Sequence, residues 1–116
     1  MNKKEQEEYL DKTFQKMKSV LVNKSSDYAG DNIDTDKLKN FKVAGNICGI
    51  SPELNCLSLI ATKVARLGVL LNSDKSPVNE SIQDSVLDLS NYALLLGMLL
   101  EDKNSDWKNL KVTKWY

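Results

Sequence analysis

The stretch SPELNCLSLIATKVARLGVLLN, residues 51–72, decides the fold of this 116-residue chain, because it carries the clearest helix start in the sequence. Ser51 suits the position just before a helix, Pro52 is favoured in the first turn, and Glu53 places a negative charge at the positive end of the helix dipole. Apolar residues then recur every three or four positions. The sequence therefore predicts a helix that ends near Asn72.

Hydrophobic periodicity predicts three further helices. The first covers residues 4–23, and the polar run around Gly30 predicts a loop after it. The second covers residues 37–48, with Thr35 or Asp36 as its cap and Gly49 as its end. The last lies within residues 79–102, where Ser81 and Asp84 have the spacing of a capping box. No segment alternates like a β-strand, so we expect an all-α fold, a small bundle of about four helices.

Composition narrows the classes of function. The chain has 16 basic and 16 acidic residues and a formal net charge of zero, which argues against binding to duplex nucleic acid or to a membrane surface. It has no histidine, and its two cysteines, Cys48 and Cys56, lack the spacing of a zinc site. The first residues, MNKKEQEEYLDK, lack the hydrophobic segment that is typical of a secretory signal. We expect one cytoplasmic domain over residues 1–116, with a C-terminal tail from residue 102.

The two long helices each present an apolar stripe that we expect to face the core. In residues 51–72 the expected core stripe is Leu57, Ile60, Val64, Leu67 and Leu71. In residues 79–102 it is Ile82, Val86, Leu89, Ala93 and Leu100. The segment from Tyr92 to Leu100 is apolar on every side, which indicates burial within a bundle or across a subunit interface. A homo-oligomer that assembles through the third and fourth helices is therefore expected.

Polar residues gather on the other sides of these helices. Glu80, Asp84 and Asp88 are spaced by four, with Asn91 on the same side. They can hold a hard cation such as Mg²⁺, or they can form ordinary salt bridges with lysines. Lys63 and Arg66 share one side of the third helix with leucines and are expected to be half exposed. This basic pair can join the acids in a structural ion-pair cluster, or it can bind the phosphates of a ligand.

Several of these residues belong to a pattern that resembles a known family. KSSDYAG at 24–30, NF at 40–41, KVARL at 63–67 and ESIQDSVLDLSNYALL at 80–95 are similar to the nucleotide modification associated domain 1 family of small, mostly phage and bacterial proteins. The resemblance covers residues 24–101, and its most specific part is E-S-x-x-D-x-x-x-D-L-x-N-Y-A.

That family is thought to be related to the all-α nucleoside triphosphate pyrophosphohydrolases of the MazG and dimeric dUTPase types. The resemblance implies an oligomeric helical bundle that binds a nucleotide and Mg²⁺. Carried over by position, it implies metal ligands at Glu80, Asp84 and Asp88, with catalytic roles for Asp84 and Asp88. It also implies phosphate contacts from Lys63 and Arg66, and a nucleoside pocket formed by Asp27, Tyr28, Asn40 and Asn91.

Three interpretations stay open. The pyrophosphohydrolases usually carry an E-x-x-E pair on one helix and an E-x-x-D pair on the next, and neither pair occurs in residues 51–72 or 79–102, where Glu53 is the only acid of the first segment and Glu80, Asp84 and Asp88 are spaced by four. In the first interpretation the protein is a Mg²⁺-dependent nucleotide hydrolase. In the second it is a phage protein that binds a nucleotide signal of host defence and sequesters it without a chemical reaction. A third possibility is an oligomeric interaction domain whose polar residues form structural ion pairs.

Overall fold

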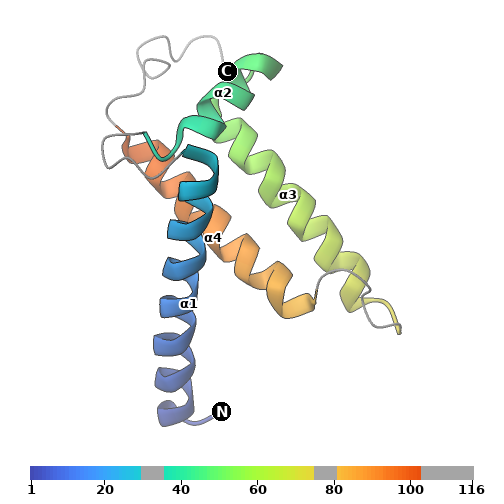
Figure 1. The fold of residues 1–116 in the computed structure, drawn as a ribbon. Helices are drawn as coiled ribbons and strands as arrows, with labels where there is room; N and C mark the ends of the chain where they lie inside the picture. Colours follow the sequence, from blue (N-terminus) through green and yellow to red (C-terminus); the bar gives the residue numbers. More distant parts are fainter. Residues whose placement is uncertain (30–35, 75–80, 103–116) are drawn as a thin grey trace. The chain divides into compact units, whose positions relative to one another are not determined.

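A computed structural model describes residues 1–29, 36–74 and 81–102, and for residues 25–29 it describes the backbone alone. This part of the chain contains four helices and no strand, which confirms the all-α class. They are α1 (Lys3–Ala29), α2 (Lys39–Cys48), α3 (Pro52–Leu71) and α4 (Ile82–Glu101), shown in Figure 1. The chain divides into two compact units, residues 1–37 and 38–116.

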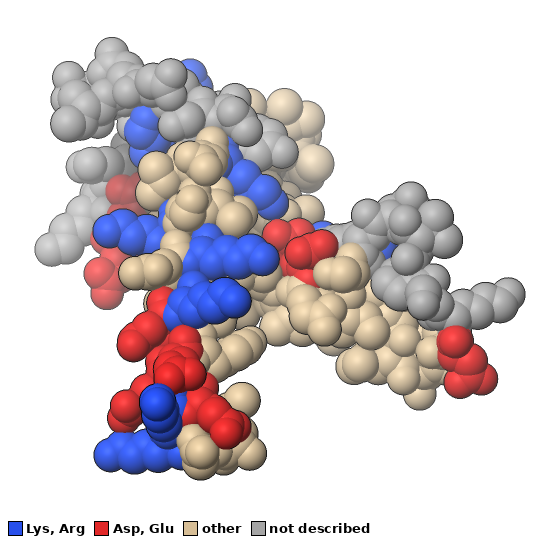
Figure 2. All heavy atoms as spheres, turned by 60° about the horizontal axis from the view of Figure 1, so that its bottom comes forward, with Lys and Arg blue, Asp and Glu red and all other residues tan. Residues whose placement is uncertain are grey.

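The first unit consists mainly of α1. The Asn2 side chain accepts a hydrogen bond from the Glu5 backbone N–H at 2.9 Å and donates one to the Glu5 carboxylate at 3.1 Å, which caps the helix start. α1 continues to Ala29, so the predicted end at residue 23 was wrong. Ser and Asp cost an established helix only a few tenths of a kcal/mol each, which does not stop its propagation. Side chains of both charge signs lie next to one another along α1 (Figure 2).

Helix α2 opens the second unit and ends as predicted. Gly49 adopts the left-handed conformation with φ 73°, and the Ile50 N–H donates to the Gly45 carbonyl at 2.9 Å. The helix begins at Lys39, so the predicted start at residue 37 with a cap at Thr35 or Asp36 was wrong. Leu38 occupies the position before the helix, and no side chain caps it. Thr35 lies outside the described residues.

Helices α3 and α4 begin at the predicted caps. The Leu54 N–H donates to Ser51 Oγ at 3.1 Å, and the Asp84 N–H donates to Ser81 Oγ at 3.0 Å. Each hydroxyl satisfies one of the backbone donors that a helix start leaves without a partner. Asn72 follows the last residue of α3, as expected.

The core of the second unit lies where α2 and α4 pack against α3. Cys56 donates a hydrogen bond to the Tyr92 carbonyl, and Lys63 pairs with Asp88, so α3 and α4 run antiparallel. The buried residues Phe41, Cys56 and Leu99 form the centre. Six half-buried side chains surround them: Leu38, Leu59, Ile60, Tyr92, Leu95 and Leu96.

The two predicted core stripes were largely wrong. Leu57, Val64 and Leu71 of α3 are 49%, 52% and 69% exposed, and Val86 and Leu100 of α4 are 42% and 61% exposed. The helices turn a neighbouring face toward each other, which is centred on Cys56 and Lys63 in α3 and on Tyr92 and Leu99 in α4. Each helix therefore has two apolar faces, and the packing of the described helices of the second unit buries one of them.

In the described part of the chain, α3 alone has the length and apolar composition that a membrane-crossing helix requires. Core helices of soluble proteins also meet this criterion, so it is weak support for a membrane span.

Candidate functional site

The candidate site is built on the Lys63–Asp88 ion pair between α3 and α4. Lys63 Nζ lies 3.0 Å from Asp88 Oδ2, and each side chain is 19% exposed. The prediction that Lys63 is only partly exposed is confirmed, and the pair joins two of the predicted site residues. A half-buried pair at this distance is electrostatically stronger than a surface salt bridge, and removal of one partner leaves a poorly solvated charge.

Asn91 lies about one turn beyond Asp88 on the same side of α4. It is only 6% exposed, and neither its amide nitrogen nor its amide oxygen has a hydrogen-bond partner among the described residues. An amide group carries two donors and one acceptor oxygen, and each such buried group without a partner costs about 1–3 kcal/mol. The Asn91 amide is therefore suited to meet a polar group that the described chain does not supply.

Ser85 was missed by the sequence analysis. It lies about one turn before Asp88, is fully buried, and its hydroxyl likewise has no hydrogen-bond partner among the described residues. The available signal was its position: Ser85, Asp88 and Tyr92 follow one another at spacings of three and four, which places them along one side of α4. A small polar residue in the row that faces α3 indicates that this packed face is not wholly apolar.

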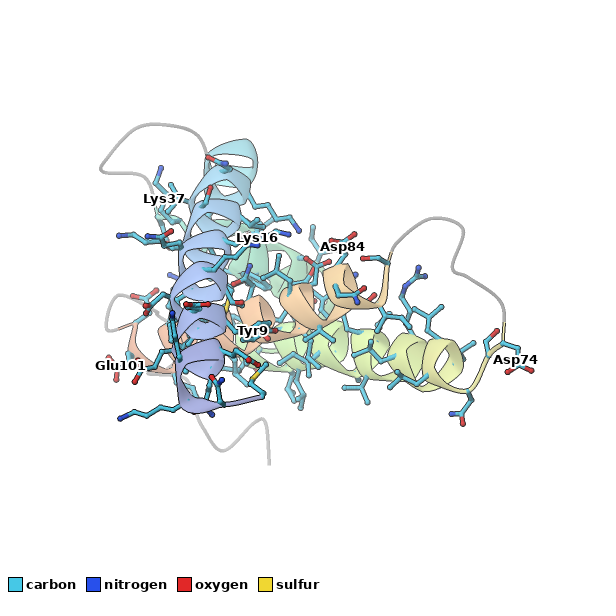
Figure 3. All side chains as sticks on the ribbon, turned by 90° about the horizontal axis from the view of Figure 1, so that it is seen from below. Tyr9, Lys16, Lys37, Asp74, Asp84 and Glu101 are labelled. Atoms are coloured by element: carbon cyan, nitrogen blue, oxygen red, sulfur yellow. The ribbon has the colours of Figure 1, made fainter. Side chains whose placement is uncertain are left out.

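The remaining basic and acidic residues of the site are more dispersed. Arg66 is half-buried about one turn after Lys63 on α3. Asp84 is exposed in the first turn of α4, where its backbone N–H takes part in the helix cap (Figure 3). This capping contact uses only the backbone of Asp84, so its carboxylate remains accessible from solvent.

Asn40 lies apart from the ion pair. It is half-buried in the first turn of α2, beside the start of α3, where the Asn55 side chain donates to the Phe41 carbonyl at 3.4 Å. Lys63 is eight residues further along α3 than Asn55, or about 12 Å along the helix axis. No described contact brings Asn40 to the ion pair.

Three predicted site residues stay untested. Asp27 and Tyr28 belong to the last turn of α1, where the structure describes only the backbone. Glu80 lies outside the described residues. The expected closure of a pocket by Asp27 and Tyr28 therefore remains a prediction.

The described acids do not form a magnesium site by themselves. Within residues 1–29, 36–74 and 81–102, no three His, Cys, Asp or Glu side chains are arranged to hold a metal ion. Asp88 already has an ammonium group at 3.0 Å, and the facing side of α3 supplies Lys63 and Arg66 rather than a second carboxylate. This donor set suits an uncharged polar group or an anion better than a divalent cation.

Cys56 lies near the site, and its thiol is not activated as a nucleophile. Burial, and secondarily the charge of Glu53, raises the pKa of the Cys56 thiol to about 11, so it stays protonated at neutral pH. Cys48 is exposed, and neither cysteine is in a disulfide. The buried thiol serves packing and donates its weak hydrogen bond to the Tyr92 carbonyl.

Comparison with protein-family models, with curated proteins and with solved structures finds no match to this chain. The resemblance to the nucleotide modification associated domain 1 family is therefore a prediction that these comparisons leave untested.

Proposed function

We propose that this protein binds a nucleotide on the polar side of the α3–α4 pair without hydrolysing it. The observation that carries the proposal is the buried Asn91 amide, which has no hydrogen-bond partner among the described residues and lies about one turn from the Lys63–Asp88 pair. An amide can both donate to and accept from the edge of a nucleobase.

The basic side chains of α3 support the same ligand class. Lys63 and Arg66 are one turn apart, and guanidinium and ammonium groups bind phosphate through charge-assisted hydrogen bonds. An ammonium group has three N–H donors, so Lys63 can donate to a phosphate oxygen while it keeps its contact with Asp88. The resemblance of residues 24–101 to a nucleotide-associated family points in the same direction.

The ion pair between Asp88 and Lys63 favours nucleotide binding without hydrolysis. A Mg²⁺ ion on Asp84 and Asp88 would have to displace Lys63 from a half-buried pair, and the described residues offer no third carboxylate. Sequestration of a nucleotide signal fits this binding proposal and its phage-family resemblance.

The test incubates the purified protein with a mixed nucleotide pool, with and without Mg²⁺. Mass spectrometry then identifies what changed in solution and what the denatured protein releases. We expect one nucleotide to be retained in both conditions while the pool stays unchanged. New monophosphate and pyrophosphate would overturn the non-catalytic proposal, and a pool that is neither retained nor changed would overturn nucleotide binding altogether.

A matched pair of variants assigns the binding to Asn91. Asn91→Leu removes the buried amide at similar volume, so we expect a folded protein that loses at least about tenfold in affinity, which corresponds to ~1.4 kcal/mol. Asn46→Leu makes the same chemical change on the exposed surface of α2 and should retain full binding. Equal binding by wild type and Asn91→Leu would exclude the Asn91 amide from the site.

A further inference from the structure

The apolar face that α3 leaves exposed has a regular composition. Six residues, none of them charged, are spaced alternately by three and four, and all six are exposed. We call them the α3 stripe: Leu54, Leu57, Ala61, Val64, Gly68 and Leu71. This is the spacing with which one helix packs along another. Figure 3 shows side chains along α3 that point away from α4.

The side-chain sizes along the α3 stripe are complementary to those along a second α3 stripe that runs antiparallel to it. If two α3 helices pack antiparallel about a point between Ala61 and Val64, Leu57 faces Gly68, Val64 faces Ala61 and Leu54 faces Leu71. A large side chain then meets a small one at four of the six positions. In a parallel pair, Gly68 would face Gly68 and Leu57 would face Leu57, which leaves a void at one level and crowding at the other.

Gly68 supplies the hollow that this arrangement needs. A Cβ atom built at Gly68 meets nothing within 4 Å, so the space over this residue is open among the described residues. A glycine within a helix costs about 0.5–1 kcal/mol relative to alanine, and nothing else in the described chain requires it at this position.

Helix α4 extends the exposed face. Its residues at the corresponding spacing are Val86, Ser90, Ala93, Gly97 and Leu100, and a Cβ atom at Gly97 also meets nothing within 4 Å. At about 100° per residue, each stripe lies about 120–130° from the face that packs against the other helix, in the same rotational sense. Because α3 and α4 are antiparallel, the two stripes lie on one side of the pair.

We propose that this face is the interface of a symmetric homodimer, in which the α3 helices of two copies pack antiparallel around a two-fold axis between Ala61 and Val64. The stripe is complementary to itself and uncharged, which a two-fold interface requires, since the same surface serves both partners. A helix of 20 residues is about 30 Å long, so two pairs of helices packed in layers form a four-helix bundle. The proposal does not rest on the nucleotide site.

Sedimentation equilibrium of the full chain in reducing buffer tests the interface, and the reductant excludes a disulfide through the exposed Cys48. We expect wild type to be dimeric and Gly68→Leu to dissociate at least about tenfold more readily, because the added side chain fills the hollow for Leu57 of the partner copy. Thr62→Leu adds an apolar side chain to an exposed position of α3 outside the stripe and should leave dimerisation unchanged.

The exchange of sizes tests the antiparallel register. In Leu57→Ala with Gly68→Leu, the large and small residues trade places but still face each other, so we expect the double variant to regain most of the association that Gly68→Leu loses. A monomeric wild type at the highest soluble concentration would overturn the proposal. So would equal dimerisation by wild type and Gly68→Leu, or a monomer that sediments with phosphatidylcholine vesicles, which would assign the face to a membrane.

Discussion

Lys63 and Asp88 are each only 19% exposed, and this incomplete solvation gives their contact a larger role than a surface salt bridge has. The charge of either residue alone would be poorly hydrated at the junction of α3 and α4. The pair therefore favours the arrangement in which Lys63 and Asp88 face each other, alongside the apolar packing around Cys56 and Leu99.

The first prediction separates these roles. Lys63→Met leaves the Asp88 carboxylate without its ammonium partner and should lower the free energy of unfolding by about 1–3 kcal/mol. Lys63→Met with Asp88→Leu replaces both charges by apolar groups and should restore stability to within about 1 kcal/mol of wild type. Urea unfolding measures both. If the pair also binds the nucleotide, the stable double variant loses binding, whereas a double variant as unstable as the single one contradicts this account of the pair.

A second prediction at this scale concerns Cys56. Burial raises its thiol pKa from 9.0 to about 11 in the folded protein. Between these pH values the unfolded chain ionises its thiol while the folded protein keeps the proton, so the unfolded state binds fewer protons and the free energy of unfolding falls with rising pH. Urea unfolding at several pH values from 8 to 11 should show this loss for wild type relative to Cys56→Ala. Parallel curves for the two proteins would contradict it.

At the scale of the element, the helix ends with a local capping signal were predictable, whereas the end of α1, the start of α2 and the buried faces were not. Ser51, Ser81 and Gly49 act through hydrogen bonds or backbone angles within a few residues, so local sequence is sufficient to identify them. The face of α3 that becomes buried depends on α4, and both helices have apolar residues on two sides. Periodicity alone favoured the leucine-rich face, because it does not anticipate that a Lys63–Asp88 pair faces inward.

The turn between α2 and α3 supplies a third prediction. A Cβ atom at Gly45 would lie 2.8 Å from the Ile50 backbone oxygen and 3.3 Å from the Ser51 backbone. Since backbone atoms have little freedom to move, Gly45→Ala should destabilise the protein by about 1–3 kcal/mol despite the better helix propensity of alanine. Asn46→Ala, at the next position and exposed, should change stability by less than about 0.5 kcal/mol. Thermal unfolding of the two variants compares them, and equal melting temperatures would show that the turn can relax.

At the scale of the whole molecule, two features of the described residues indicate further contacts: a polar site whose buried amide has no partner among those residues, and an apolar face of α3 and α4 that those residues leave exposed. Few of the large apolar side chains in the described chain are fully buried, and larger exposed apolar patches mark interaction surfaces. The site residues Lys63 and Asp88 were predictable as chemical types, but their direct contact was not, because it depends on the register of two helices that are separated in sequence.

The Lys42–Asp102 ion pair connects the beginning of the second unit to the end of α4, across 60 residues of sequence. Lys42 Nζ lies 2.6 Å from Asp102 Oδ2, and the side chains are 21% and 14% exposed. Asp102 directly follows the last residue of α4, where the negative end of the helix dipole disfavours an acid. The lysine therefore offsets two unfavourable effects on Asp102, its partial burial and the helix dipole.

The two partners should consequently respond unequally to substitution, which is the last prediction. Lys42→Met leaves the carboxylate near the helix end without its cation and should lower the free energy of unfolding by about 1–3 kcal/mol. Asp102→Asn loses the same ion pair but removes the repulsion from the dipole, so its cost should be smaller by about 0.3–1 kcal/mol. Urea unfolding at low ionic strength measures both, and added salt should narrow the gap because it screens the dipole term. A larger cost for Asp102→Asn would mean that Asp102 holds α4 mainly through contacts other than Lys42.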